Sequence, residues 1–548
     1  MPRSLLQLDS SDNVLIALED LKAGERVEFG EHTYALVRNV PAKHKFAMRH
    51  FDEGDSVVMY GVLVGKAVKP IPAGELLTTV NIQHQASAFH EQSGEYRWTP
   101  PDISRRKQQT FLGYRRSDGQ VGTRNYWLVV PLVFCENKNI QVLKQALEEE
   151  LGFAAPQLYR HQVAELARLY REGRINNEGH AAPVAAAPAQ RRRLFENVDG
   201  IRFLVHEGGC GGTREDSNNL CGLIAGYIHH PNVAGATVLS LGCQHAQIGI
   251  LREEIRKRNR TFDKPLFILE QQRSGSEAAM VSDAIQQTFH GLVEANKAQR
   301  TPASLADLCV GLKCGGSDGF SGISANPAIG HTADLLTALG GRTILSEFPE
   351  LCGVEQELIN RAASKEVGNR FIQLMRDYAA RAAAVGSGFD MNPSPGNMRD
   401  GLLTDAMKSA GAAKKGGTSP VTAVLDYPEY STEQGLNLQC TPGNDVECVT
   451  AQVGAGANVV LFTTGLGTPT GNPVAPVIKL STNSALAQRM HDIIDIDTGA
   501  VVAGEKTIAQ MGETILDLVI EVASGEVRTK AEQKAQEDFI PWKRGVSL

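Results

Sequence analysis

The sequence predicts an α/β protein in which a small β-rich module, of the β-barrel or β-clip kind, precedes a large α/β region with parallel or mixed sheets. Its first 90 residues contain short apolar stretches separated by Gly, Asp, Pro and Ala, a pattern typical of closely spaced strands. Beyond residue 110, continuous apolar runs alternate with helix-like segments, as expected for sheets covered by helices on both faces. With 548 residues the chain is long enough for several domains.

Changes in composition along the chain divide it into four segments. Residues 1–90 form the β-rich module, and residues 91–110 form a polar linker in which Pro100 and Pro101 block helix formation. Residues 111–300 form a first α/β part, with an insertion at about 155–197 whose Ala/Pro-rich stretch, 180–193, is expected to be exposed. Residues 301–548 form a second α/β part, whose last helical pattern ends at Gly525.

Charge and hydropathy exclude several classes of protein. The chain carries 55 Lys and Arg against 62 Asp and Glu, a net charge of −7, so a generally basic nucleic-acid binder is excluded. Its mean hydropathy is −0.20, and no apolar run approaches the roughly 20 residues of a membrane-spanning helix. We predict a cytoplasmic protein with no nucleic-acid or membrane partner. A homo-oligomer is compatible with the sequence.

Four of the nine cysteines directly follow apolar, strand-like runs. They are Cys135, Cys210, Cys243 and Cys314. The carboxyl ends of strands line the ligand crevice of an open α/β sheet, so these thiols could converge there. His206 and His245 lie close to two of them, and thiolate with imidazole suits iron or zinc. The alternative is four cysteines that fill strand ends and bind nothing, because no local CxxC pair is present.

Two glycine-rich turns carry the other candidate site residues. The stretch LKCGGSDGFSGISANPAIGH (312–331) follows a strand and presents amides, hydroxyls and charged groups to an anion, unless it is only a tight turn with polar caps. The turn GLGTPTG (465–471) and the strand after it add Thr468, Lys479 and Asn483. Neither turn fits a Walker A loop or a dinucleotide-binding fingerprint.

Several longer motifs resemble the altronate dehydratase/galactarate dehydratase family over almost the entire chain. They are DNVLIAL, HKFAM, FLGYRRSDGQVGTRN, LSLGCQ, GLKCGGSDGFSGISANPAIG, NPSPGN, FTTGLGTP and PVIKLSTN. The resemblance implies an N-terminal SAF-type module and a dehydratase region that depends on iron. It also implies β-elimination of water from a small-molecule hexonate or hexarate, which gives a 2-keto-3-deoxy acid.

This chemistry suggests roles for the candidate residues. An α-proton next to a carboxylate is a poor acid, so its removal requires a base and stabilisation of the developing enediolate. Asp318, His44 and Lys45 are the candidate acids or bases, and Lys313 is the candidate oxyanion partner. The predicted substrate-binding residues are Ser317, Asn326, Asn397, Thr468, Lys479 and Asn483. The four strand-end cysteines are predicted to bind Fe²⁺, and the alternative is a [4Fe–4S] cluster held by three of them.

The chain also departs from the family pattern. Met398, Ala406 and Leu466 stand where the family usually has charged residues, and residues 78–81 read TTVN instead of HxHN. Either the substrate differs or other cations, Arg214, Arg399 and Lys414, replace the lost ones. We expect a dehydratase acting on D-altronate, with galactarate or another sugar acid as the alternative. A sugar-acid-binding paralogue without turnover is the alternative from a different class.

Overall fold

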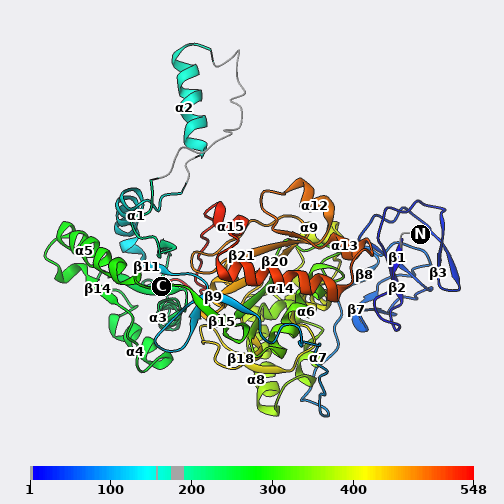
Figure 1. The fold of residues 1–548 in the computed structure, drawn as a ribbon. Coiled ribbons are helices and arrows are strands. Elements are labelled where there is room, and N and C mark those ends of the chain that lie inside the picture. The colour runs from blue at the N-terminus through cyan, green and yellow to red at the C-terminus, as the bar shows by residue number, and fades with distance from the viewer. Residues whose placement is uncertain (1–3, 156–157, 175–190) are drawn as a thin grey trace.

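The N-terminal module consists of three small antiparallel sheets. The computed structural model describes residues 4–155, 158–174 and 191–548. The sheets of the module have the orders β1-β2-β5, β3-β4 and β6-β7-β8. Their strands are β1 (Leu5–Leu6), β2 (Val14–Ala17), β3 (Arg26–Phe29), β4 (His32–Ala35), β5 (Lys45–Ala47), β6 (Ser56–Met59), β7 (Val62–Ala67) and β8 (Ile82–Gln83). The β-rich module expected from the short apolar stretches is therefore present, at one end of the molecule (Figure 1).

The first α/β part is built on a four-stranded parallel sheet of order β12-β11-β13-β14. Its strands are β11 (Tyr126–Pro131), β12 (Gly200–Phe203), β13 (Val233–Ser240) and β14 (Leu266–Glu270). Its helices are α1 (Asn137–Leu151), α2 (Leu158–Arg171), α3 (Arg214–His229), α4 (Ile248–Arg258) and α5 (Glu277–Ala295). A small sheet, formed by β9 (Thr110–Arg115), β10 (Val121–Gly122) and β15 (Thr301–Ser304), joins the two ends of this part. Of the predicted exposed stretch 180–193, residues 180–190 lie outside the described residues.

The second α/β part contains a seven-stranded parallel sheet of order β18-β19-β17-β16-β20-β21-β22. The strands are β16 (Cys309–Cys314), β17 (Arg342–Leu345), β18 (Val421–Leu425), β19 (Gly435–Gln439), β20 (Val459–Thr464), β21 (Val477–Ser481) and β22 (Ile496–Asp497). The helices are α6 (Ala325–Ala338), α7 (Glu355–Asn360), α8 (Lys365–Ala384), α9 (Pro395–Arg399), α10 (Asp405–Ala413), α11 (Asp445–Gly454), α12 (Ser484–Arg489), α13 (Gly499–Val502), α14 (Ile508–Ser524) and α15 (Lys530–Gln533). The predicted last long helix is α14, which ends before Gly525. No helix of the described residues combines the length and apolar character needed to cross a bilayer.

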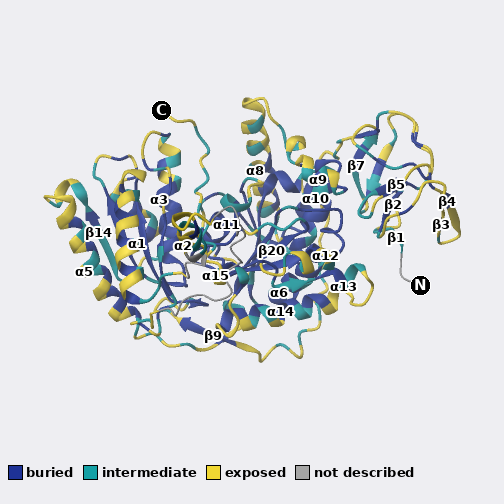
Figure 2. Ribbon diagram, turned by 90° about the horizontal axis from the view of Figure 1, so that it is seen from above, coloured by how far each residue is buried: buried dark blue, intermediate teal, exposed yellow. Residues whose placement is uncertain are grey.

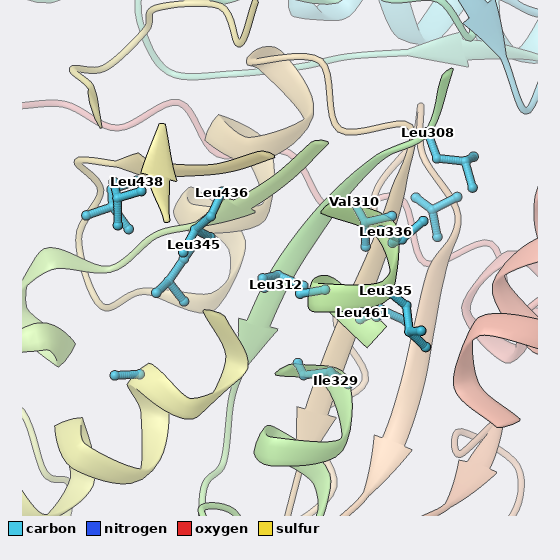
Figure 3. Close-up of a cluster of buried hydrophobic side chains, with 14 of the residues drawn as sticks. Leu308, Val310, Leu312, Ile329, Leu335, Leu336, Leu345, Leu436, Leu438 and Leu461 are labelled. Carbon is cyan, nitrogen blue, oxygen red and sulfur yellow. The ribbon is translucent and has the colours of Figure 1, made fainter. Parts of the chain in front are cut away.

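Apolar side chains from strands and helices hold the seven-stranded sheet in place. Leu308, Val310 and Leu312 of the β16 segment belong to one buried cluster with Ile329 and Leu335 of α6, which Figure 3 shows. All of these side chains are fully buried, and burying each one contributes roughly 1.5–3 kcal/mol before entropy is counted. Figure 2 shows the buried strands at the centre of each α/β part and the exposed helix faces outside. The carboxyl ends of the strands are thereby fixed rigidly.

The N-terminal module shares a hydrophobic core with the second α/β part. Phe51, Val57 and Met59 of the module belong to the same buried cluster as Phe320 and Met407. Met407 lies in α10, and Phe320 lies in the glycine-rich turn that follows β16. The module therefore packs against the segment that carries several candidate site residues.

Candidate active site

The candidate site lies where the order of the seven-stranded sheet reverses. From β16 the chain continues to β17 on one side of the sheet, and β20 later pairs with β16 on the other side. Open α/β sheets bind ligands outside the carboxyl ends of the strands at such a point. Cys314 ends β16 and pairs in register with Thr463 of β20. The glycine-rich turn predicted as a site therefore begins at the switch point.

A buried group of acidic and basic side chains surrounds Cys314, and we call it the lysine–glutamate cluster. Its members come from the ends of β16 and β17, from the N-terminus of α11 and from the α10 segment. They are Lys313, Cys314, Glu347, Glu350, Lys408, Lys415 and Asp445. Sequence reasoning missed five of these seven. Glu347 directly follows the apolar run GRTILS, so the strand-end rule applied to the cysteines could have found it.

Lys313 is the central cation of the cluster. Its ammonium contacts Glu347, lies 2.8 Å from Asp445 Oδ1 and donates to the Cys314 carbonyl at 2.6 Å. Burial alone would lower the pKa of Lys313, but Asp445 and Glu347 raise it well above its ordinary value. Lys313 is therefore a permanent cation at the end of β16.

Two further lysines complete the cluster from the α10 segment. Lys415 Nζ donates to Cys314 Sγ at 2.7 Å and lies 3.5 Å from Glu347 Oε2. Lys408 Nζ contacts Glu350 Oε1 at 2.8 Å and Asn392 Oδ1 at 2.6 Å. The side chain of Asp445 is 29% exposed, whereas those of Lys313 and Glu347 are fully buried. Asp445 therefore marks a side on which the cluster reaches solvent.

The two glutamates of the cluster have pKa values shifted in opposite directions. Burial and the neighbouring Glu350 raise the pKa of Glu347, whose Oε2 has no hydrogen-bond partner among the described residues. Burial would also raise the pKa of Glu350, but Lys408, Lys313 and Lys415 outweigh it and lower that pKa to about 2. Glu347 also has left-handed backbone angles, φ 70° and ψ 66°, which are strained for a residue with a side chain. Separated carboxyl pKa values and local strain are both typical of active sites.

The structure separates Cys314 from the other three predicted metal ligands. Cys135, Cys210 and Cys243 follow β11, β12 and β13 of the four-stranded sheet, whereas Cys314 belongs to the seven-stranded sheet. Among the described residues, the one group of three candidate ligand atoms within 4.8 Å of one another is Cys314, Glu347 and Glu350. Lys415 already donates to Cys314, and both Lys415 and Lys313 lie beside Glu347. A metal cation placed there would face their ammonium charges, so the donor set does not suit a metal as it stands.

Cys135, Cys210 and Cys243 lie on three loops that meet around Gly208 and Gly209. The Gly208 carbonyl accepts from Phe134 N at 3.1 Å, and the Gly209 carbonyl accepts from His245 N at 3.0 Å. A Cβ on Gly209 would lie 2.2 Å from the Leu132 carbonyl oxygen, so only glycine permits this approach. All three cysteines are exposed. Of the two nearby histidines, His206 is buried, its Nε2 lies 2.8 Å from the Pro131 carbonyl oxygen, and burial lowers its pKa to about 4.

The Asp318 carboxylate is fully buried and fully engaged. Its Oδ1 accepts from Ser321 Oγ at 3.1 Å and from the Phe320 amide at 3.2 Å. Its Oδ2 accepts from Thr482 at 3.1 Å and Asn483 at 3.3 Å and contacts Lys43 Nζ at 3.0 Å. Asp318 therefore binds protein groups on both oxygens, which leaves it poorly placed to accept a substrate proton.

Most of the predicted substrate-binding side chains are engaged in the same way. Asn397 donates to the Ser317 carbonyl at 2.8 Å. Asn326 accepts from the Thr463 hydroxyl at 2.7 Å and donates to the Gly411 carbonyl at 3.0 Å. Lys479 donates to the Thr470 carbonyl, and burial lowers its pKa to about 7. Within the described part of the chain, neither the Ser317 nor the Thr468 hydroxyl has a hydrogen-bond partner. These two remain the freest of the predicted substrate contacts.

The three positions that depart from the family pattern lie in α9, in α10 and in the turn after β20. Ala406 is buried in α10 against Gly353, and Leu466 lies beside Gly316 of the glycine-rich turn. Met398 is half-buried in α9. Of the cations in this region, Lys408 and Lys415 reach the cluster.

Comparisons with known proteins agree with this architecture and assign the family. Models described as the altronate/galactarate dehydratase SAF domain, the D-galactarate dehydratase/altronate hydrolase second domain and the D-galactarate/altronate dehydratase C-terminal domain match residues 3–85, 113–296 and 305–547. An altronate dehydratase of Bacillus subtilis (strain 168) is 33% identical over 546 residues, which cover 100% of both chains. The chain belongs to the altronate/galactarate dehydratase family.

Two proteins of Escherichia coli (strain K12) are further relatives in this family. An altronate dehydratase is 31% identical over 545 residues, with 99% of each chain covered. A galactarate dehydratase (L-threo-forming) is 30% identical over 535 residues, covering 96% of this chain and 94% of the relative. The predicted family resemblance and the SAF module are thus confirmed, and the chain is a sugar-acid hydro-lyase.

Proposed function

We propose that this hydro-lyase removes water from a hexonate, D-altronate, and forms 2-dehydro-3-deoxy-D-gluconate. The full-length similarity to two altronate dehydratases supports this substrate. In the reaction, a base takes the C2 proton and the released electron pair forms a C2–C3 double bond. The C3 hydroxyl leaves as water with a proton from an acid. The resulting enol then tautomerises to the 2-keto acid.

The lysine–glutamate cluster is the observation that carries this proposal. Its three lysines face Glu350, Asp445 and Glu347, and burial favours the protonated form of Glu347. Three ammonium groups therefore lie beside these carboxyl groups at the carboxyl end of β16. They can pair with the C1 carboxylate that hexonates and hexarates share, and the similarity to altronate dehydratases favours the hexonate. The same lysines would stabilise the enediolate that forms after proton removal.

For the iron that the family resemblance implies, the proposed ligands are Cys135, Cys210 and Cys243. A tetrahedral metal with bonds of about 2.3 Å holds sulfur ligands about 3.8 Å apart. The three thiols do not form a group within 4.8 Å, which favours the [4Fe–4S] alternative because a cluster binds each sulfur through a different iron. When bound, an iron with an open position would supply a Lewis acid at the loops after β11, β12 and β13.

A substrate panel assayed after anaerobic purification tests the reaction. We expect 2-keto-3-deoxy acid from D-altronate at a kcat/KM well above that for galactarate and other hexonates or hexarates. A better rate on galactarate would reassign the substrate within the family. Tight sugar-acid binding without any keto acid would favour the paralogue without turnover.

The iron proposal has its own test in Cys210→Ser. This variant is expected to lose most of its iron and acid-labile sulfide while its circular dichroism stays unchanged, because Cys210 is exposed and packs no core. Cys221→Ser is a poor comparison because that residue is buried, so the control is Ser282→Ala on the exposed surface of α5. Unchanged iron and sulfide in Cys210→Ser would contradict the assignment.

A further inference from the structure

The N-terminal module inserts one turn, Ala42–Lys45, into the second α/β part, and we call it the docking turn. The Lys43 carbonyl oxygen lies between Gly319 and Gly401, where a Cβ would stand only 2.4 Å and 2.5 Å from it. Lys45, fully buried, donates from Nζ to the Gly401 carbonyl at 2.7 Å. Both glycines therefore form a receptor shaped for the backbone of this turn.

Lys43 fastens the docking turn through its side chain. Its Nζ lies 3.0 Å from Asp318 Oδ2 and 3.1 Å from Asp400 Oδ1, so one ammonium joins the glycine-rich turn to the loop after α9. Lys43 has φ 77°, a left-handed backbone conformation that costs energy in a residue with a Cβ. The two ion pairs and the glycine contacts hold it in this conformation. Asp318 thereby acts as a receptor for the module and not as a free carboxylate.

The docking turn also contains His44, and it leaves the Nε2 atom of this residue without a hydrogen-bond partner among the described residues. Its Nδ1 lies 3.3 Å from the Ala42 carbonyl oxygen, which favours the tautomer with the proton on Nδ1 and leaves Nε2 as an acceptor. No side chain within the described residues bonds Nε2. Burial lowers the pKa of His44, and the charged groups that face it are Lys45, Asp400 and Lys43. By contrast, Asp318 is occupied on both oxygens and Lys45 is fully buried.

We propose that Lys43 is a positioning residue that locks the docking turn against Asp318 and Asp400 and so holds His44 Nε2 as the proton acceptor of the dehydration. This inference rests on the proposed function. With this arrangement, the N-terminal module contributes a catalytic residue to the site. The C2 proton of the sugar acid moves to Nε2, and the imidazolium then donates this proton to solvent or to the leaving hydroxyl.

Lys43→Met and Lys43→Arg form the central comparison. Lys43→Met is expected to lower kcat by about 100-fold, as a misplaced catalytic group does, with KM changed much less. It also removes a cation that lowers the pKa of His44, so the acid limb of the kcat/KM profile should move to higher pH. Lys43→Arg keeps the charge and should restore most of kcat and the position of that limb. A role in packing alone would not move the limb.

Further variants and controls separate this inference from the proposed function. His44→Gln should abolish exchange of the substrate α-proton with D₂O, and Gly401→Ala should lower kcat by obstructing the Lys43 carbonyl while it leaves both side chains in place. Lys69→Met, at an exposed position of the same module, should match wild type. An inactive wild-type enzyme would overturn the proposed function. Active wild type together with normal kcat or an unmoved acid limb in Lys43→Met would overturn the positioning role.

Discussion

Replacing Lys313 with methionine is expected to abolish measurable turnover and to lower the free energy of unfolding by about 3–5 kcal/mol. Its ammonium is fully buried and contacts Glu347 and Asp445. Removing it leaves Glu347 with only Lys415, at 3.5 Å, as a cationic neighbour. Glu347 thus keeps one cationic neighbour where it had two, and Asp445 loses its contact with Lys313; that cost exceeds the gain from a well-packed methionine.

Denaturant unfolding and steady-state kinetics measure the two effects of Lys313→Met. Lys297→Met is the matched control, because its partner Glu294 is exposed and such pairs contribute about 1 kcal/mol at most. The double variant Lys313→Met/Glu347→Gln should regain part of the stability and none of the activity, since it removes the carboxyl group that lost a cationic neighbour while the Lys313 cation is still missing. Lys313→Met with wild-type stability and kcat would contradict the role assigned to the cluster.

The strand-end rule recovered only the local part of the candidate site from the sequence. It located Lys313, Cys314 and the glycine-rich turn because these residues end a strand or directly follow it and need no tertiary information. Lys408 and Lys415 come from a helical segment about a hundred residues later, and Lys43 comes from another module. Whether these three lysines reach the site depends on how helices and modules pack against one another, and the local spacing of residues does not encode this packing.

The cysteines show a second limit of the same rule. Each of the four does follow a strand, as expected. The expectation of one shared site required all the strands to belong to one sheet, but the apolar runs of the chain form two separate parallel sheets. Apolar periodicity identifies buried strands without indicating which sheet each one joins. The loops that carry three of the cysteines consequently meet at one sheet, and Cys314 accepts from Lys415 at the other.

The fold class was more predictable than the site because it depends on patterns repeated over many residues. Alternating buried runs and helices restrict the large region to parallel sheets with helical cover, and both parts have that architecture. Roles at single residues were less predictable. The sequence makes Asp318 a candidate acid or base in a glycine-rich turn. In the structure its carboxylate is paired with Lys43 and accepts hydrogen bonds from Thr482 and Asn483.

Lys45→Met is expected to remove the pH dependence that Lys45 gives to the stability of the docked module. Burial lowers the pKa of Lys45 to about 7, and nearby Asp318 only partly offsets this. An unfolded lysine titrates at about 10.4, so between these values the unfolded chain binds more protons and stability rises with pH. The shift corresponds to a contribution of about 5 kcal/mol that opposes folding below pH 7 and disappears toward pH 10.

Urea unfolding midpoints from pH 6.5 to pH 10 measure this effect as a difference between variants, so that other titrating groups cancel. Lys45→Met should equal or exceed wild-type stability at pH 6.5, because it removes a costly buried charge. It should fall below wild type near pH 10, where the neutral amine keeps its hydrogen bond to the Gly401 carbonyl and the methionine has none. Lys69→Met should follow wild type throughout. A constant difference between Lys45→Met and wild type across this range would mean that Lys45 stays charged in the folded protein, with a counter-charge from Asp318 strong enough to offset its burial.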